Sequence, residues 1–373
     1  MFLKLWIYRN TRLNHNAYRR IVSGEDRRPG VGLLRGLLGA VSLLYGLVMR
    51  FRNLLFNSGI LRSHTASIPV ISIGNITTGG TGKTPLVIWL CGYLRGKGLH
   101  SSILTRGYKT QPDQITDEPA LLAKACPGTD VIVNANRVAG ARKAISVHRA
   151  QVLVMDDGFQ HRRLKRDLDI VAVDATCPFG YGRVLPVGLL REPKGGLSRA
   201  DAVIITRFDQ ADAEQMQQLE QQIQQISPSI PIAKAVHRHT HAATYQNAKF
   251  DMEELRSKKI LAFCGIGNPN AFFRCLEQNG LSLADTQIFD DHHPYTQDEM
   301  KQIFERARSC GAEMILCTQK DWVKSALLSP EEEDVVFAYL AMELDFIEGF
   351  DKITPLIDNL FSNQSEEYGT ISE

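Results

Sequence analysis

Short apolar segments alternate with amphipathic segments along most of the 373-residue chain, and turn-forming residues separate them. In the first part of the chain, the segments with the composition of buried strands are 70–73, 103–105, 131–133, 152–155, 170–173 and 202–205. Helical patterns at 86–95 and 210–226 lie among them. This alternation predicts right-handed β-α-β units and a parallel sheet that helices cover on both faces.

The alternation stops at residues 228–245, where two prolines and alternating residue types predict an extended linker or β-ribbon. A second strand–helix unit follows, with strands predicted at 260–264, 287–289, 314–317 and 335–338. The expected divisions are 1–62 for a basic arm with an amphipathic helix, 63–227 for the larger α/β domain, 228–257 for the linker, 258–362 for a second, smaller α/β domain and 363–373 for a polar tail.

Residues 31–48 form an apolar run in which Arg35 is the only charged residue. Leu37, Val41 and Leu44 recur on one side at helical spacing, whereas small and polar residues gather on the other. The first 62 residues carry eleven Lys or Arg but only two acidic residues, although the net charge of the chain is +2. A helix of this kind predicts binding at a membrane interface; a helix packed on the core and a true membrane span are the alternatives.

Composition narrows the remaining classes of function. The seven cysteines include no CxxC pair and no metal-like spacing, which disfavours a disulfide scaffold or a zinc domain. The basic arm could also suit nucleic acid, but it has no interleaved aromatic residues and matches no nucleic-acid-binding module. We therefore expect no nucleic-acid partner.

A glycine-rich loop between the first strand and the first helix carries the strongest chemical signal. Backbone N–H groups of such a loop surround phosphate oxygens, Lys83 reaches the β- and γ-phosphates, and the Thr84 hydroxyl binds Mg²⁺. Thr77 departs from the usual pattern, which has glycine at that position. The residues predicted to bind ATP are Thr77, Thr78, Gly79, Gly80, Thr81, Gly82, Lys83 and Thr84.

Charged residues follow several of the predicted strands. Asp156 and Asp157 end the strand 152–155, at the edge of a parallel sheet where they would face the nucleotide. Phosphoryl transfer also needs cations on the transferred phosphoryl group and a group that orients the attacking hydroxyl. The candidates for these roles are Arg106, Asp117, Arg137, Arg191, Glu192 and His292.

Several of these residues fall in motifs that occur in a fixed order. The motifs are GNITTGGTGKTPL, LTRGY, DEP, DDGFQHRRLKRD, GRVLPVGLLREP and FDDHHPY. The chain resembles the tetraacyldisaccharide 4'-kinases, lipid A pathway enzymes of Gram-negative bacteria, from its basic N-terminus to about Lys324. The resemblance implies a peripheral enzyme on the cytoplasmic face of the inner membrane. Such an enzyme transfers the γ-phosphate of ATP to the 4'-hydroxyl of an anionic tetraacyldisaccharide 1-phosphate, giving lipid IVA.

The resemblance also implies residue roles. Asp157 and His292 resemble a pair that activates the sugar hydroxyl, with Lys83, Asp117 and Arg191 as further catalytic residues. Gln160 and Arg137 match polar residues near ATP, and the expected Mg²⁺ ligands are Thr84, Asp156 and Glu192.

The predicted fold is thus a P-loop NTPase-like parallel-sheet domain and a smaller α/β domain, joined by a β-ribbon linker and preceded by a membrane-associating helix. We expect a monomer. The alternative function is a membrane-associated P-loop ATPase switch, which would release phosphate to water. Such switches usually carry a second lysine signature in the loop and lack a second catalytic domain, unlike this chain.

Overall fold

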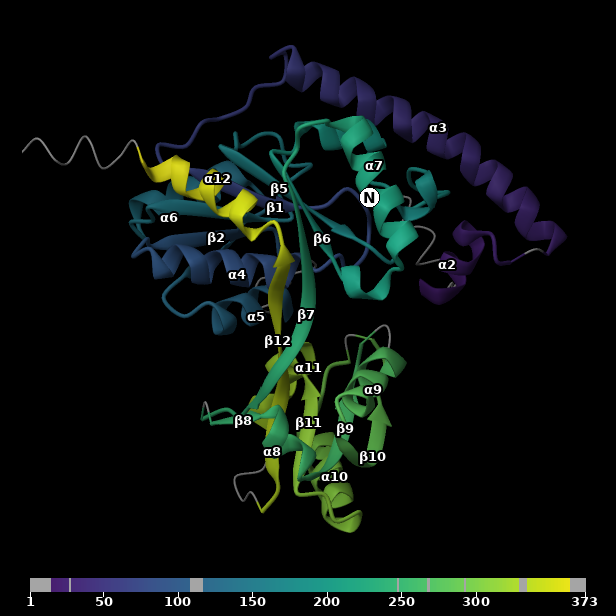
Figure 1. Ribbon diagram of the computed structural model, residues 1–373, viewed down its shortest axis with the longest axis vertical. Helices are drawn as coiled ribbons and strands as arrows, with labels where there is room; N and C mark the ends of the chain where they lie inside the picture. The colour runs from purple at the N-terminus through teal and green to yellow at the C-terminus, as the bar shows by residue number, and fades with distance from the viewer. Residues whose placement is uncertain are drawn as a thin grey trace, which may run out of the picture. The chain divides into compact units, whose positions relative to one another are not determined.

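The computed structural model describes residues 15–26, 28–107, 117–246, 248–266, 269–291, 293–328 and 334–362 (Figure 1). The chain divides into two compact units. Unit 1 contains Met1–Arg106, Gly128–Val236 and Asp345–Glu373, and unit 2 contains Gly107–Pro127 and His237–Leu344.

The sheet of unit 1 has the order β7-β6-β5-β1-β4-β2-β3, and all its neighbouring strands are parallel. The strands are β1 (Val70–Gly74), β2 (Ser101–Thr105), β3 (Asp130–Val133), β4 (Val152–Asp156), β5 (Leu168–Asp174), β6 (Ala202–Thr206) and β7 (Ile232–Ala243). Every residue of β1, β4, β5 and β6 is buried. Strands that are buried on both faces require helices on both sides of the sheet, as the continuous apolar segments predicted.

Helices cover this sheet through apolar residues at helical spacing. The helices of unit 1 that pack around it are α4 (Lys83–Gly96), α6 (Arg137–Ser146), α7 (Ala213–Ile226) and α12 (Phe350–Ser362). Leu86, Leu90 and Leu94 of α4 are fully buried beside β1, β2 and β4. Leu219 and Ile223 of α7 join the apolar cluster on β5 and β6. Because β1 lies in the middle of the sheet, the loop that follows it is held between well-packed elements.

Two helices precede the sheet, α2 (His15–Ser23) and α3 (Pro29–Asn57). Helix α3 extends beyond the predicted run 31–48 at both ends and lies along the outside of unit 1 (Figure 1). Its small and polar side faces the protein, because Ser42 is 4 % exposed and its Oγ donates to the carbonyl oxygen of Val184 at 2.9 Å. The Tyr18 hydroxyl of α2 donates to the carbonyl oxygen of Pro186 at 2.8 Å.

Unit 2 has its own parallel strands, in the order β10-β9-β11-β12. They are β9 (Lys259–Cys264), β10 (Ser282–Ile288), β11 (Met314–Thr318) and β12 (Val336–Glu348), and β8 (Lys249–Asp251) pairs antiparallel with β7. Leu261 and Phe263 of β9 belong to one apolar cluster, and Ile260 and Ala262 belong to another. This alternation shows that the sheet is covered on both faces. Its helices are α5 (Asp117–Ala125), α8 (Met252–Arg256), α9 (Pro269–Gln278), α10 (Gln297–Ser309) and α11 (Gln319–Ser325).

The bounds of the two units differ from the expected divisions in two places. Helix α12, expected in the second domain, belongs to unit 1, where the Asp358 carboxylate accepts a hydrogen bond from the Tyr93 hydroxyl at 2.8 Å. Helix α5, expected in the larger domain, belongs to unit 2, where Lys124 lies 4.8 Å from the centre of the Trp322 ring. Residues 228–257, expected as an extended linker or β-ribbon, contain β7, β8 and α8, and the chain passes from unit 1 to unit 2 within the extended strand β7.

Candidate active site

The glycine-rich loop joins β1 to α4, as predicted. Gly74 has no room for a side chain, because a Cβ there would lie 2.5 Å from the Cβ of Phe159. The Asn75 amide, which is fully buried, donates to the Thr81 hydroxyl at 2.8 Å and closes the loop. Gly82 has a φ of 79° and starts α4, a backbone conformation that favours glycine. The first N–H groups of α4 therefore face the loop and are available to phosphate.

Thr77 is the residue that departs from the usual loop pattern, and the structure gives a physical reason. Thr77 forms an antiparallel bridge with Leu190. On either side of it, Thr78 N donates to the Leu189 carbonyl at 2.7 Å and Arg191 N donates to the Ile76 carbonyl at 2.8 Å. An extended residue that makes such a bridge gains nothing from glycine. The start of the loop is thus hydrogen-bonded to the segment that carries Arg191 and Glu192.

Arg207 contacts the loop from the end of β6, a position that the sequence analysis did not select. Its guanidinium donates to the Gly80 carbonyl at 2.7 Å and pairs with Asp174 at the end of β5. Arg207 has a φ of 53°, which is uncommon for a non-glycine residue. A charged residue directly after a parallel strand was a signal shared with Arg106, and it would also have identified Arg207.

Asp157 lies directly after β4, next to the loop. One of its carboxylate oxygens is 3.3 Å from Lys83 Nζ, and the other is 2.7 Å from an Arg191 nitrogen. The Asp157 side chain is 37 % exposed, so it is open to a ligand. Burial alone would raise the pKa of Asp157, but the charges of Lys83 and Arg191 outweigh it and hold that pKa below the usual range. Asp157 is thus a carboxylate between two cations that phosphate would also attract.

Asp156 is the last residue of β4 and is only 7 % exposed. Its carboxylate accepts a hydrogen bond from the Thr105 hydroxyl at 3.1 Å. Arg137 is 4 % exposed and donates to the Asp156 carbonyl at 3.2 Å, which supports the same strand end. Burial lowers the pKa of Arg137 to about 10, although Asp156 and Asp157 act in the opposite direction. Arg137 therefore lies close to the aspartate pair.

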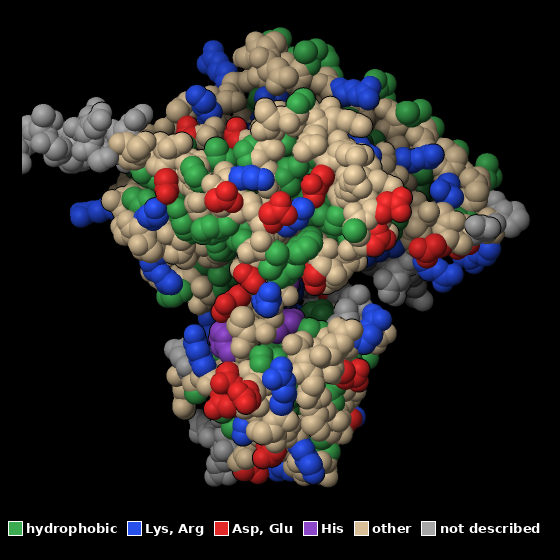
Figure 2. Space-filling model, in the orientation of Figure 1, with side chains coloured by type: hydrophobic (Ala, Val, Ile, Leu, Met, Phe, Trp, Pro, Cys, Tyr) green, Lys and Arg blue, Asp and Glu red, His purple; other side chains and the backbone are tan. Residues whose placement is uncertain are grey.

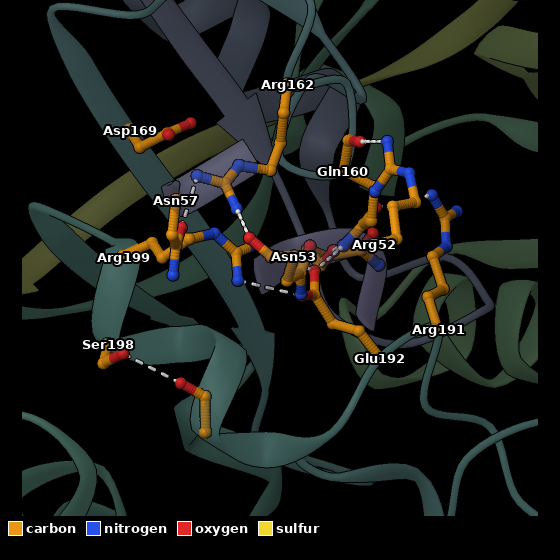
Figure 3. A network of polar contacts seen from close by, with 12 residues as sticks. Arg52, Asn53, Asn57, Gln160, Arg162, Asp169, Arg191, Glu192, Ser198 and Arg199 are labelled. Carbon is orange, nitrogen blue, oxygen red and sulfur yellow. Dashed lines mark hydrogen bonds and ion pairs between the residues drawn. The ribbon is translucent and has the colours of Figure 1, made fainter. Parts of the chain in front are cut away.

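Glu192 is fully buried and forms the centre of a polar network (Figure 3). Its Oε2 lies 2.9 Å from an Arg199 nitrogen and accepts a bond from the Asn53 amide at 2.9 Å. Its Oε1 accepts bonds from Arg199 and from the Gln160 amide, both at 3.0 Å. Gln160 also donates to the Asn75 carbonyl at 2.8 Å, and its side-chain oxygen accepts from Arg191 at 3.4 Å. Both oxygens of Glu192 are occupied by nitrogen donors, an arrangement that does not suit the predicted Mg²⁺ ligation.

Two predicted catalytic residues cannot be located at the site. His292 lies outside the described residues, and so does the side chain of Asp117, whose backbone begins α5. The neighbouring His293 is described, and its Nε2 lies 3.1 Å from Glu299. The structure thus brings together Lys83, Asp156, Asp157, Gln160, Arg137, Arg191 and Glu192, with the loop residues 77–84.

The outer face of α3 is apolar and uncovered. Leu37, Leu44 and Leu47 are between 60 % and 64 % exposed. By length and composition alone, Gly30–Asn57 would be long and apolar enough to cross a membrane. In Figure 2, hydrophobic and basic side chains lie next to each other along this helix. A row of exposed leucines on a helix whose polar side contacts the protein marks an interaction surface.

The parallel sheet, the glycine-rich loop with Lys83 and Thr84, and the aspartate pair on the neighbouring strand define a nucleotide-binding protein of the P-loop class. A family model described as tetraacyldisaccharide-1-P 4'-kinase matches residues 34–361. The chain belongs to this family, as its motifs predicted.

Similar proteins agree with this assignment. Curated relatives named tetraacyldisaccharide 4'-kinase include those of Chlorobaculum tepidum (38 % identity, 78 % of this chain and 86 % of the relative) and Pelobacter propionicus (35 % identity, 87 % and 93 %). A crystal structure of LpxK from Aquifex aeolicus in complex with ATP is similar, with a TM-score of 0.71 and 28 % identity over 88 % of this chain and 99 % of that one. The predictions of an α/β P-loop fold and of a phosphotransferase are confirmed.

Proposed function

We propose that this protein transfers the γ-phosphate of ATP to the 4'-hydroxyl of tetraacyldisaccharide 1-phosphate and so forms lipid IVA in lipid A biosynthesis. The observation that carries the proposal is the triad of Lys83, Asp157 and Arg191, with Asp157 within 3.3 Å of both cations beside the phosphate loop. An apolar helix packs against the segment that supplies Arg191, where an acylated substrate would approach.

The triad can change partners when ATP binds. The triphosphate attracts Lys83 and Arg191 more strongly than a single carboxylate does, since it offers more charge and more acceptor oxygens. Asp157 would then be released next to the γ-phosphate, where it can accept a hydrogen bond from the attacking group. Lys83 and Arg191 would carry the negative charge of the transferred phosphoryl group, which is the main requirement of this reaction.

Phosphoryl transfer of this class uses Mg²⁺, and the residues present fit it. The Thr84 hydroxyl and the Asp156 carboxylate are the hard oxygen ligands that Mg²⁺ prefers. The described residues contain no group of three or more His, Cys, Asp or Glu that could enclose a metal ion. This is compatible with Mg²⁺, which keeps water and takes further ligands from phosphates. We propose Thr84 and Asp156 as its ligands and assign Glu192 a structural role instead of the metal role expected from the sequence.

His292 and Asp117 complete the proposed chemistry by their residue types and by the family resemblance. An imidazole that accepts the proton of the 4'-hydroxyl is well matched to neutral pH, and the carboxylate of Asp157 would stabilise the imidazolium that results. This proposal gives Asp157 an orienting and electrostatic role, because an aspartate carboxylate is a much weaker base than an imidazole.

The lipid substrate explains the apolar helix. Removing acyl chains from a bilayer costs roughly 0.8 kcal/mol for each buried CH₂, so the enzyme has to work at the membrane surface. We propose that α3 docks on the cytoplasmic face of the inner membrane through its exposed leucines and receives the acyl chains there. The accompanying arginines would meet lipid phosphates.

The function is tested by incubating the full-length protein with γ-labelled ATP, Mg²⁺ and tetraacyldisaccharide 1-phosphate in detergent micelles. Label should appear in the lipid, and it should be lost when the 4'-hydroxyl is blocked. Release of the label to water, with none in the lipid, would instead support a membrane-associated ATPase switch. A Lys83→Ala variant controls for contaminating kinases.

The membrane role is tested separately with a Leu37→Asp, Val41→Asp and Leu44→Asp triple variant. These side chains are at least 40 % exposed, so the substitutions should leave the fold intact. Cosedimentation with anionic vesicles should fall strongly, while ATP binding stays unchanged. Unchanged vesicle binding and unchanged lipid turnover would refute the role of α3 in docking.

A further inference from the structure

Helix α3 makes polar contacts with two segments that build the phosphate site. The Tyr45 hydroxyl donates to the Arg191 carbonyl at 2.7 Å, and Arg52 donates to the Gln160 carbonyl at 2.8 Å. The Asn53 amide donates to buried Glu192 at 2.9 Å, as Figure 3 shows. These three residues lie on the same side of α3 as Ser42, the side opposite the exposed leucines.

The contact at Asn53 differs from the others because its acceptor is a buried charge. Glu192 is fully buried, so each of its donors holds a carboxylate that water cannot reach. Arg199 and Gln160 supply the other donors. Asn53 is the donor that comes from α3. Without it, Oε2 of Glu192 would keep only its contact with Arg199 within the described part of the chain.

Glu192 is linked to the reacting region by two short paths. It follows Arg191 in the chain, and Arg191 pairs with Asp157 at 2.7 Å. It also fixes Gln160, which donates to the Asn75 carbonyl at the start of the phosphate loop. A shift of Glu192 would therefore move both the cation beside Asp157 and the entry to the loop.

We propose that Asn53 and Tyr45 are positioning residues for phosphoryl transfer, so that α3 sets the geometry of the phosphate site in addition to its contact with lipid. This inference rests on the proposed function. It implies that the site is fully ordered only when α3 is seated along unit 1. Docking of α3 and assembly of the catalytic residues are then coupled through the Asn53–Glu192 hydrogen bond.

The first test compares two asparagines on the same helix. Asn53→Leu removes the donor to Glu192. Asn57→Leu removes a side chain that also makes one hydrogen bond, with Arg162 at 2.8 Å, but does not contact Glu192. Because a displacement of about 1 Å at reacting groups can cost on the order of 10²-fold in rate, Asn53→Leu should lower kcat at least about ten-fold. Its KM for ATP and its vesicle binding should change little, and Asn57→Leu should behave as the natural protein.

Two further variants keep the test decisive if Asn53→Leu folds poorly. Tyr45→Phe removes one hydroxyl from the α3 contact with Arg191 and should lower kcat by a few-fold. Asn53→Asp places a second carboxylate beside Glu192 and should lower kcat more than Asn53→Leu does. Its kcat relative to that of the natural protein at the same pH should partly recover as the pH falls and one carboxyl group takes up a proton. A structural defect alone would not give this recovery.

The outcomes separate this inference from the function on which it rests. If the natural protein transfers no phosphate to the lipid, the proposed function fails. If the natural protein is active and folded Asn53→Leu and Tyr45→Phe keep its kcat, only the positioning role fails. Equal losses in Asn53→Leu and Asn57→Leu, or a loss confined to vesicle binding, would likewise overturn it and leave α3 as a membrane anchor.

Discussion

Asp157 and Glu192 of unit 1 both bind arginine, yet their surroundings give them different tasks. Asp157 is 37 % exposed and contacts two cations, Lys83 and Arg191, that a nucleotide would also attract. Glu192 is fully buried and bonded to Arg199 and two amides. A carboxylate with exchangeable partners can take part in a reaction, whereas one with occupied, buried oxygens maintains structure. Exposure and the type of partner, more than the residue type, therefore distinguish a carboxylate that can react from one that stabilises the fold.

The largest expected effect is the loss of catalysis on replacing Asp157 with Asn. Removing a positioned acid–base or electrostatic group typically costs on the order of 10²- to 10⁴-fold, so kcat for lipid phosphorylation should fall by about 10³-fold. ATP affinity should not weaken, because Lys83 and Arg191 lose a competing anion. Steady-state kinetics and ATP titration check both statements. Asp209→Asn, at an exposed carboxylate after β6, should be neutral. If Asp157→Asn kept the kcat of the natural protein, Asp157 would have no catalytic role that distinguishes it from Glu192.

Replacing Glu192 with Ala should mainly cost stability. The change leaves Arg199 without its carboxylate partner in a mostly buried place, and breaking such a pair costs roughly 3–5 kcal/mol. Glu220→Ala is the matched control, since Glu220 pairs with Lys234 near the surface and should cost at most about 1 kcal/mol. Denaturant unfolding followed by tryptophan fluorescence measures the difference. Equal losses of unfolding free energy in the two variants would contradict the structural role of Glu192.

The sequence predicted the Asp157 site better than the Glu192 site, for a physical reason. A phosphate loop, a strand end and an adjacent parallel strand are local patterns, and the rule that parallel strands share one edge brings Lys83 and Asp157 together. The Glu192 network joins α3, the segment after β4 and the segment before β6, so only the folded chain reveals it. Glu192 was therefore predicted as a metal ligand from its place in a motif.

For other elements, too, features set by neighbouring residues could be predicted from the sequence, and features set by long-range contacts could not. Periodicity along 31–48 correctly predicted which side of α3 is apolar, because helical spacing is a local property. The return of α12 to unit 1 and the packing of α5 in unit 2 depend on contacts between residues far apart in sequence, such as Tyr93 with Asp358. Arg207 lay between these cases: its place after a strand was visible, but its contact with Gly80 was not.

The dependence of kcat on pH tests which group takes the proton. Lys83 and Arg191 keep the pKa of Asp157 below its usual range in the free enzyme, and an ordinary aspartate, with a pKa of about 4, is already mostly ionised at pH 5. A decrease of kcat between pH 8 and pH 5 must therefore come from another group, and we expect His292. The decrease should disappear in His292→Gln, whose residual rate should be flat over this range. If it persists there with the same midpoint, the base is a different residue.

The smallest expected effect concerns His161, which follows Gln160 on the segment between the two carboxylates. Burial and then the charges of Arg137 and Arg166 lower the pKa of His161 to about 4. The folded protein therefore favours neutral His161, whereas the unfolded chain takes up a proton on this residue near pH 6.5. The free energy of unfolding is unaffected by His161 above pH 6.5 and declines as the pH falls from 6.5 toward 4. Because His161 is only partly buried, the loss should be on the order of 1 kcal/mol between pH 6.5 and pH 5.

His161→Asn should flatten the decline of unfolding free energy by that amount. Denaturant unfolding at several pH values measures the slopes. A flattened slope would show that burial and the nearby charges of Arg137 and Arg166 disfavour a proton on His161. Identical slopes in the variant and the natural protein would mean that solvent screens His161 from these effects.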